Sequence, residues 1–94
     1  MSRIVAKSNN SNPYSHFVKT DDGNTYYVDS CDTPDCSFET MVFRAEELGT
    51  PGRQFEVLDW GELYLEHYSD FDEMVEKHSY ICTHLEELLG KEAY

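Results

Sequence analysis

Four side chains of the kinds that bind zinc occur in two pairs along the chain. Cys31 and Cys36 are separated by four residues, and His78 and Cys82 by three. Residues i and i+4 lie on the same face of a helix, so His78 and Cys82 are predicted to be neighbours. Thiolates and imidazoles are the usual ligands of structural zinc. The sequence therefore offers a candidate zinc site of Cys31, Cys36, His78 and Cys82, although it lacks the Cys-x-x-Cys spacing of the strongest zinc motifs.

The same residues also have an interpretation in which no cofactor is bound. His78 and Cys82 fall in the apolar stripe of a predicted helix, where a free cysteine packs as a small hydrophobic side chain. A buried His78 then needs a hydrogen-bond partner, most simply a strand carbonyl or a tyrosine hydroxyl. A disulfide between Cys31 and Cys36 is a third interpretation, which a reducing cytoplasm disfavours. We expect core packing with no cofactor and keep zinc as the alternative.

Motifs for catalysis or calcium binding are missing from the sequence. It has no G-x-S-x-G elbow, no glycine-rich phosphate loop and no H-E-x-x-H pair. Cys82 and His84 point to different sides of a helix, so they cannot share a proton as a catalytic pair. The acidic residues Asp29, Asp32 and Asp35 lack the ligand pattern of a calcium loop. The chain is therefore predicted not to be an enzyme.

A second candidate site lies on the opposite side of the same predicted helix. At about 100° per residue, the face away from the apolar stripe carries carboxylates around one tyrosine. Tyrosines are common binding hot spots, and carboxylates attract a basic partner. We therefore expect a docking surface for a host protein with a basic surface, and the simpler alternative is a solvated helix face. The candidate residues are Asp72, Glu73, Glu76, Tyr80, Thr83 and Glu87.

The composition restricts the class of protein. The 94 residues suit one small domain, and 19 acidic against 7 basic residues give a formal net charge of −12. An aromatic content of 14% argues against a disordered acidic tail. The shortage of lysine and arginine argues against direct binding of nucleic acid. No apolar run reaches the roughly 20 residues that span a bilayer, and no secretory signal is visible. We expect a cytoplasmic protein without membrane contact, of open oligomeric state.

The elements that must position these residues are predicted from patterning. Residues 1–13 are expected to be a loosely ordered N-terminal segment, in which residues 2–7 could form a short edge strand, and residues 14–94 a single domain. β-Rich runs occur at residues 14–20, 25–29, 38–43, 55–58 and 62–67, and residues 45–48 suit one helical turn. Trp60 is expected to close one end of the layer between sheet and helix. The predicted fold class is α+β, an antiparallel meander of about four strands with one long C-terminal helix on one face.

The Asp-Gly pair at residues 22–23 predicts a β-hairpin with a two-residue turn. Such a turn pairs Phe17 with Val28 and puts both on one face of the sheet. Val18 and Tyr27 then lie on the other face.

The C-terminal segment carries the clearest periodicity. Apolar or semi-apolar residues recur at helical spacing, which predicts one amphipathic helix over residues 70–89. Ser69 is the expected N-cap, and Gly90 the expected residue after the end. The stripe consists of Phe71, Met74, Val75, His78, Ile81, Cys82, Leu85, Leu88 and Leu89.

Three motifs resemble those of a known group of proteins. They are E-T-M-V-F at residues 39–43, W-G-E-L at 60–63, and Tyr68-Ser69 opening a helix with His78. This pattern is similar to an uncharacterised family of small proteins from phages and mobile elements of gut bacteria. The resemblance implies no activity and no catalytic residue. It implies a phage-linked accessory protein, and by analogy an inhibitor of host defence such as an anti-CRISPR protein.

Overall fold

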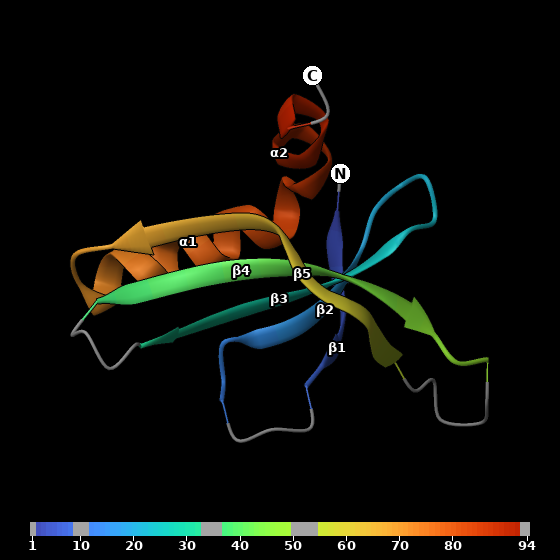
Figure 1. The fold of residues 1–94 in the computed structure, drawn as a ribbon, viewed down its shortest axis with the longest axis horizontal. Helices are drawn as coiled ribbons and strands as arrows, with labels where there is room; N and C mark the ends of the chain where they lie inside the picture. Colours follow the sequence, from blue (N-terminus) through green and yellow to red (C-terminus); the bar gives the residue numbers. More distant parts are fainter. Residues whose placement is uncertain (1, 9–11, 33–36, 50–54, 93–94) are drawn as a thin grey trace.

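The computed structural model describes residues 2–8, 12–32, 37–49 and 55–92. Their strands form one antiparallel sheet in the order β1-β2-β3-β4-β5, in which each strand pairs with the next. Two helices follow the sheet, and α2 stands at a steep angle to α1 (Figure 1). The elements are β1 (Arg3–Lys7), β2 (Ser15–Lys19), β3 (Thr25–Asp32), β4 (Phe38–Glu47), β5 (Phe55–Tyr68), α1 (Phe71–Thr83) and α2 (Leu85–Glu92).

The prediction of four strands and one long helix is wrong. The additional strand is β1, which gains ladder hydrogen bonds along β2. Residues 45–47 continue β4 instead of forming a helical turn, because they pair with residues 55–57 of β5. The two separate runs at 55–58 and 62–67 belong to the single strand β5. Pairing with a neighbouring strand therefore outweighed local helical preference.

The loop between β2 and β3 differs from the predicted two-residue turn. The N–H of Gly23 donates to the Thr20 carbonyl, and the N–H of Thr20 donates to the Asn24 carbonyl, both over 3.0 Å. Gly23 has a φ of 90°, which suits glycine. The Asp22 carboxylate accepts from the Asn24 N–H at 3.2 Å and from the Thr20 hydroxyl. The loop is thus a three-residue turn closed by a left-handed glycine.

This longer turn shifts the register by one residue. His16 lies opposite Val28, and Phe17 lies opposite Tyr27. A shift of one residue turns every side chain of one strand to the other side of the sheet. Val18 therefore shares a face with Val28, and Phe17 shares a face with Tyr27, which reverses the predicted grouping. His16 and Val18 face the helices, whereas Phe17 and Tyr27 face away from them.

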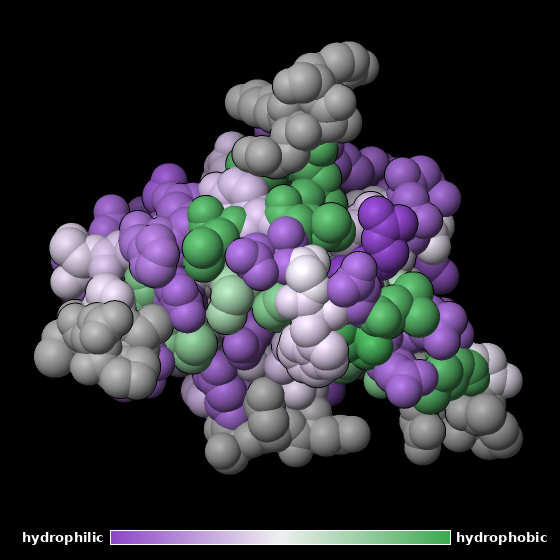
Figure 2. Space-filling model, in the orientation of Figure 1, coloured by the Kyte–Doolittle hydropathy of each residue, from purple (hydrophilic) through white to green (hydrophobic). Residues whose placement is uncertain are grey.

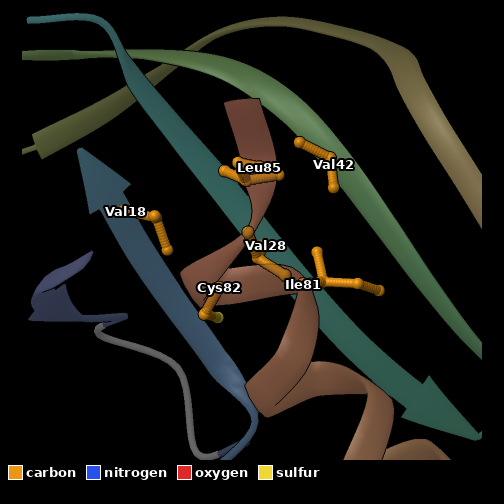
Figure 3. Packing of buried hydrophobic residues seen from close by; sticks show 6 residues of the cluster. All are labelled: Val18, Val28, Val42, Ile81, Cys82 and Leu85. Atoms are coloured by element: carbon orange, nitrogen blue, oxygen red, sulfur yellow. The ribbon is translucent and has the colours of Figure 1, made fainter. Parts of the chain in front are cut away.

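The layer between sheet and helices holds the first hydrophobic core. One valine from each of β2, β3 and β4 contacts side chains from the region where α1 ends and α2 begins. Figure 3 shows the helical side chains directed toward these valines. All six residues are almost fully buried: Val18, Val28, Val42, Ile81, Cys82 and Leu85.

The predicted single helix over residues 70–89 is interrupted at His84, which has φ −129° and ψ 26°. The buried hydroxyl of Ser2 lies at this interruption. It donates to the Cys82 carbonyl at 2.7 Å and accepts from the Leu85 N–H at 3.0 Å. Ser2 thus satisfies backbone groups that a continuous helix would pair internally.

The other face of the sheet carries an aromatic core. Phe17 of β2 stacks on Phe55 of β5 with ring centroids 5.3 Å apart, although β3 and β4 lie between these strands. In a flat sheet, three strand spacings would separate them by about 14 Å. The sheet must therefore curl, and register irregularities in β4 and β5 permit this. Trp60 contacts Tyr27 and Phe43 on this face and is 68% exposed, so it does not close the layer between sheet and helix.

No described helix has the length and hydropathy required to cross a membrane. The face seen in Figure 2 carries hydrophilic side chains interleaved with small hydrophobic groups.

Replacing Leu85 by alanine is expected to lower the free energy of unfolding by about 2–5 kcal/mol, because a fully buried leucine leaves a cavity. Leu58→Ala is the matched control, since Leu58 is 52% exposed, and its effect is expected to stay within about 0.5 kcal/mol. Chemical denaturation measures both. Equal losses would contradict the docking of the helices on the sheet.

Candidate functional site

Three potential metal ligands meet in the layer between sheet and helix. His16 comes from β2, and His78 and Cys82 come from successive turns of α1. His16 Nδ1 lies 2.8 Å from His78 Nε2, and Cys82 Sγ lies 3.6 Å from the same nitrogen. Their ligand atoms all lie within 4.8 Å of one another. We call these three residues the His-His-Cys cluster. Chemically, it offers two nitrogens and one sulfur to a cation.

The other ring nitrogen of His78 also has a partner. Ser30 Oγ lies 2.6 Å from His78 Nδ1 and 2.6 Å from Thr40 Oγ1. Ser30 and Thr40 are fully buried and face each other across β3 and β4. His78, which is 4% exposed, therefore uses both ring nitrogens, as a buried histidine must. Its partners are side chains of β2 and β3, not the strand carbonyl or tyrosine hydroxyl that the sequence suggested.

Burial favours the neutral forms of these groups. Burial, and then the neighbouring His16, lower the pKa of His78 to about 4. Burial, and then the Lys7 ammonium, lower the pKa of His16. Burial raises the pKa of Cys82 to about 12. At neutral pH both imidazoles are therefore neutral, and the thiol keeps its proton unless a cation replaces it.

A cavity of about 610 Å³ adjoins the cluster. Tyr14 connects the two, because its ring packs edge-on against His78 at 6.1 Å and against Phe71 at 5.6 Å between centroids. Ser30 belongs both to the cavity wall and to the hydrogen-bond chain of His78. Other wall residues are Asn12, Pro13, Phe38 and Met74.

The predicted zinc set is only partly brought together. His78 and Cys82 are neighbours, as their spacing predicted. Cys31 is not in the group of potential ligands found among the described residues. It is a half-buried free thiol on β3, and burial, then the Asp29 carboxylate, raise its pKa. Cys36 lies outside the described residues, and with it the disulfide that was the third, disfavoured interpretation.

His16 and Ser30 are not among the site residues that the sequence predicted. His16 of β2 and Ser30 of β3 share the helix-facing side of the sheet only when the β2–β3 turn has three residues. The expected two-residue turn would put His16 on the face opposite to Ser30. The signal that could have revealed them is Gly23, which suits the left-handed last position of a three-residue turn as well as it suits a two-residue one.

The predicted docking residues lie on two helices. Asp72, Glu73, Glu76 and Tyr80 are exposed on α1, Thr83 is the half-buried last residue of α1, and Glu87 is exposed on α2. The interruption at His84 therefore divides the expected continuous face.

Glu73 has a structural role at the start of α1. The N-cap is Asp70, one residue later than predicted, and its carboxylate accepts from the Glu73 N–H at 2.7 Å. In return, Glu73 Oε1 accepts from the Ser69 N–H at 3.2 Å. This reciprocal arrangement resembles a capping box, so Glu73 stabilises the helix terminus.

A recess of about 230 Å³ lies where α1 meets α2, lined by Thr83, His84, Glu86 and Glu87. The His84 ring stacks on Tyr80 with centroids 4.0 Å apart and ring planes 9° apart. His84 Nδ1 also lies 2.9 Å from the Tyr80 carbonyl oxygen. An exposed aromatic ring therefore stands beside a recess with two glutamates. We call Tyr80 and these four residues the junction recess.

Ser30→Ala is expected to lower the free energy of unfolding by about 1–3 kcal/mol, because it removes a shared partner from His78 and Thr40 in a buried site. Ser79→Ala, at an exposed position of α1, is the matched control and is expected to have little effect. Urea unfolding of both variants measures the difference. If Ser30→Ala lowers the free energy of unfolding as little as Ser79→Ala does, the hydrogen bonds of Ser30 to His78 and Thr40 do not stabilise the fold.

Comparisons with protein-family models, curated proteins and solved structures find no match to this chain. The resemblance to phage and mobile-element proteins therefore stays a prediction, and a function has to be inferred from the geometry of the cluster and of the recess.

Proposed function

We propose that this chain is a non-enzymatic binding protein that docks a protein with a basic surface at the junction recess. The observation that carries the proposal is the position of Tyr80, which is 46% exposed and stands beside the recess that Glu86 and Glu87 line. An aromatic ring next to carboxylates suits an arginine or lysine of a partner, because the cation can pair with oxygen and lie over the ring.

The ring already attracts a cation of its own chain. Lys77 Nζ lies 5.9 Å from the centre of the Tyr80 ring. A guanidinium from the partner would replace this ammonium, and its planar fork could reach a glutamate at the same time.

The recess is also organised before binding. Stacking on His84 holds the Tyr80 ring, and the Thr83 hydroxyl donates to the carbonyl oxygens of Ser79 and Tyr80 at 3.2 and 3.1 Å. Little side-chain freedom is then lost when a partner docks, which favours affinity.

The net charge of −12 supports the choice of a basic partner, because it accelerates the encounter with a positive surface at low salt. The resemblance to phage and mobile-element proteins suggests where the chain acts and what its binding does to the partner. In that form the chain works in the cytoplasm and inhibits the host protein that it binds.

Tyr80→Ala is expected to weaken binding about 30-fold, roughly 2 kcal/mol, while Tyr80→Phe costs less because the ring remains. Fluorescence anisotropy on a panel of arginine- and lysine-rich peptides identifies the best peptide, on which the variants are compared. Leu58→Ala, an exposed position on β5, is the control and should bind like the wild type. If Tyr80→Ala binds as well as the wild type, the recess is not the docking site.

Reversing Glu76 and Glu87 to lysine changes the net charge from −12 to −8 and is expected to slow association and weaken its salt dependence. Glu73 is left in place because it caps α1. Stopped-flow mixing with the same peptide at low and high salt measures the rates. Unchanged association at low salt would exclude these carboxylates from the encounter.

A further inference from the structure

We propose that His16, His78 and Cys82 bind a zinc ion that joins β2 to α1. This site is independent of the junction recess, because it lies on the buried side of α1. It also differs from the zinc set suggested by spacing, since Cys31 and Cys36 take no part.

Two of the three distances between ligand atoms are close to those of a tetrahedral zinc site, and the third, from His16 to Cys82, is within 4.8 Å. With typical bond lengths of about 2.0 Å to nitrogen and 2.3 Å to sulfur, a ligand nitrogen and sulfur should be about 3.5 Å apart. His78 Nε2 and Cys82 Sγ are 3.6 Å apart. Two ligand nitrogens should be about 3.3 Å apart, and those of His16 and His78 are 2.8 Å apart. A shift of about half an ångström by the half-buried His16 ring would bring these two nitrogens to the expected distance.

The surroundings of His78 suit a metal ligand. A ligating histidine usually donates its second N–H to an oxygen, which fixes the ring and leaves the other nitrogen free. Ser30 Oγ is placed to accept from Nδ1–H of His78 and can donate its own proton to Thr40. In that tautomer, Nε2 carries the lone pair, and its neighbours are His16 Nδ1 and Cys82 Sγ.

Binding of Zn²⁺ replaces the hydrogen bond between the imidazoles and the S–H bond of Cys82 by bonds to the metal. The hydrogen bond between the two imidazoles breaks. The proton that His16 Nδ1 donates in this bond is lost to solvent while Nε2 of the same ring takes one up, so that His16 Nδ1 and His78 Nε2 each give a lone pair to Zn²⁺. The Cys82 thiol releases its proton to solvent and binds as thiolate, since a coordinated thiol is deprotonated. One water completes four-coordination, as at other sites with three protein ligands.

The electrostatic setting permits a cation. Lys7 lies opposite His16 on β1 and opposes added positive charge. Its side chain is exposed, so solvent and salt screen this repulsion, and the protein as a whole carries a net charge of −12.

Cobalt titration tests the proposal on the full chain. The reduced protein is stripped of metal with a chelator and titrated with Co²⁺, a coloured substitute for Zn²⁺. We expect saturation at one equivalent, a thiolate-to-cobalt charge-transfer band, and loss of that band when one equivalent of Zn²⁺ is added. No band, or no stoichiometric uptake, would overturn the proposal.

Variants assign the ligands. Cys82→Ser should abolish the charge-transfer band, whereas a Cys31→Ser/Cys36→Ser double variant should keep it as the matched control. The opposite pattern would overturn the proposal and favour the set suggested by spacing.

If Cys82→Ser does not fold, His16→Gln on β2 serves instead, with an expected loss of zinc affinity of at least about 10-fold. Ser30→Ala should weaken zinc binding by about 10- to 100-fold through the orientation of His78. Full zinc affinity in both His16→Gln and Ser30→Ala would also overturn the proposal.

Discussion

The register of the β2–β3 hairpin determines which side chains meet the helices. A left-handed Gly23 closes the three-residue turn, and this turn puts His16 and Val18 on the face that α1 covers. A shift of one residue would direct Phe17 to the helix and His16 away from it. His78 would then be buried without its nitrogen partner on β2. The turn and the burial of His78 therefore depend on each other, because a buried imidazole needs a partner for each ring nitrogen.

Helical spacing was the most reliable signal in the sequence. Five of the nine residues assigned to the apolar stripe are buried, namely Met74, His78, Ile81, Cys82 and Leu85, whereas Phe71 at the start of the stripe is 46% exposed. The contact between His78 and Cys82 followed from the same spacing. A periodic pattern records which side of a helix meets the core, so it predicts neighbours within one element well.

Contacts between elements were not predictable in the same way. The interruption at His84 depends on Ser2, whose hydroxyl reaches the helix from the other end of the chain. The partner of His78 on β2 depends on the length of one turn, and Cys31 was grouped with His78 only because both are zinc-binding types. Such contacts are decided by tertiary structure, and a local pattern of residue types does not record them.

The contact of Ser2 with the helix junction bears on the order of folding. It joins residues 83 positions apart, and it can form only after all five strands and α1 have been synthesised. Closing so long a loop is entropically costly, and structures rich in distant contacts fold slowly. On the ribosome, β1 is made before the other strands of the sheet, yet its neighbouring serine must wait for α2 to emerge. The bend between α1 and α2 is thus expected to form late, as one of the final steps of folding.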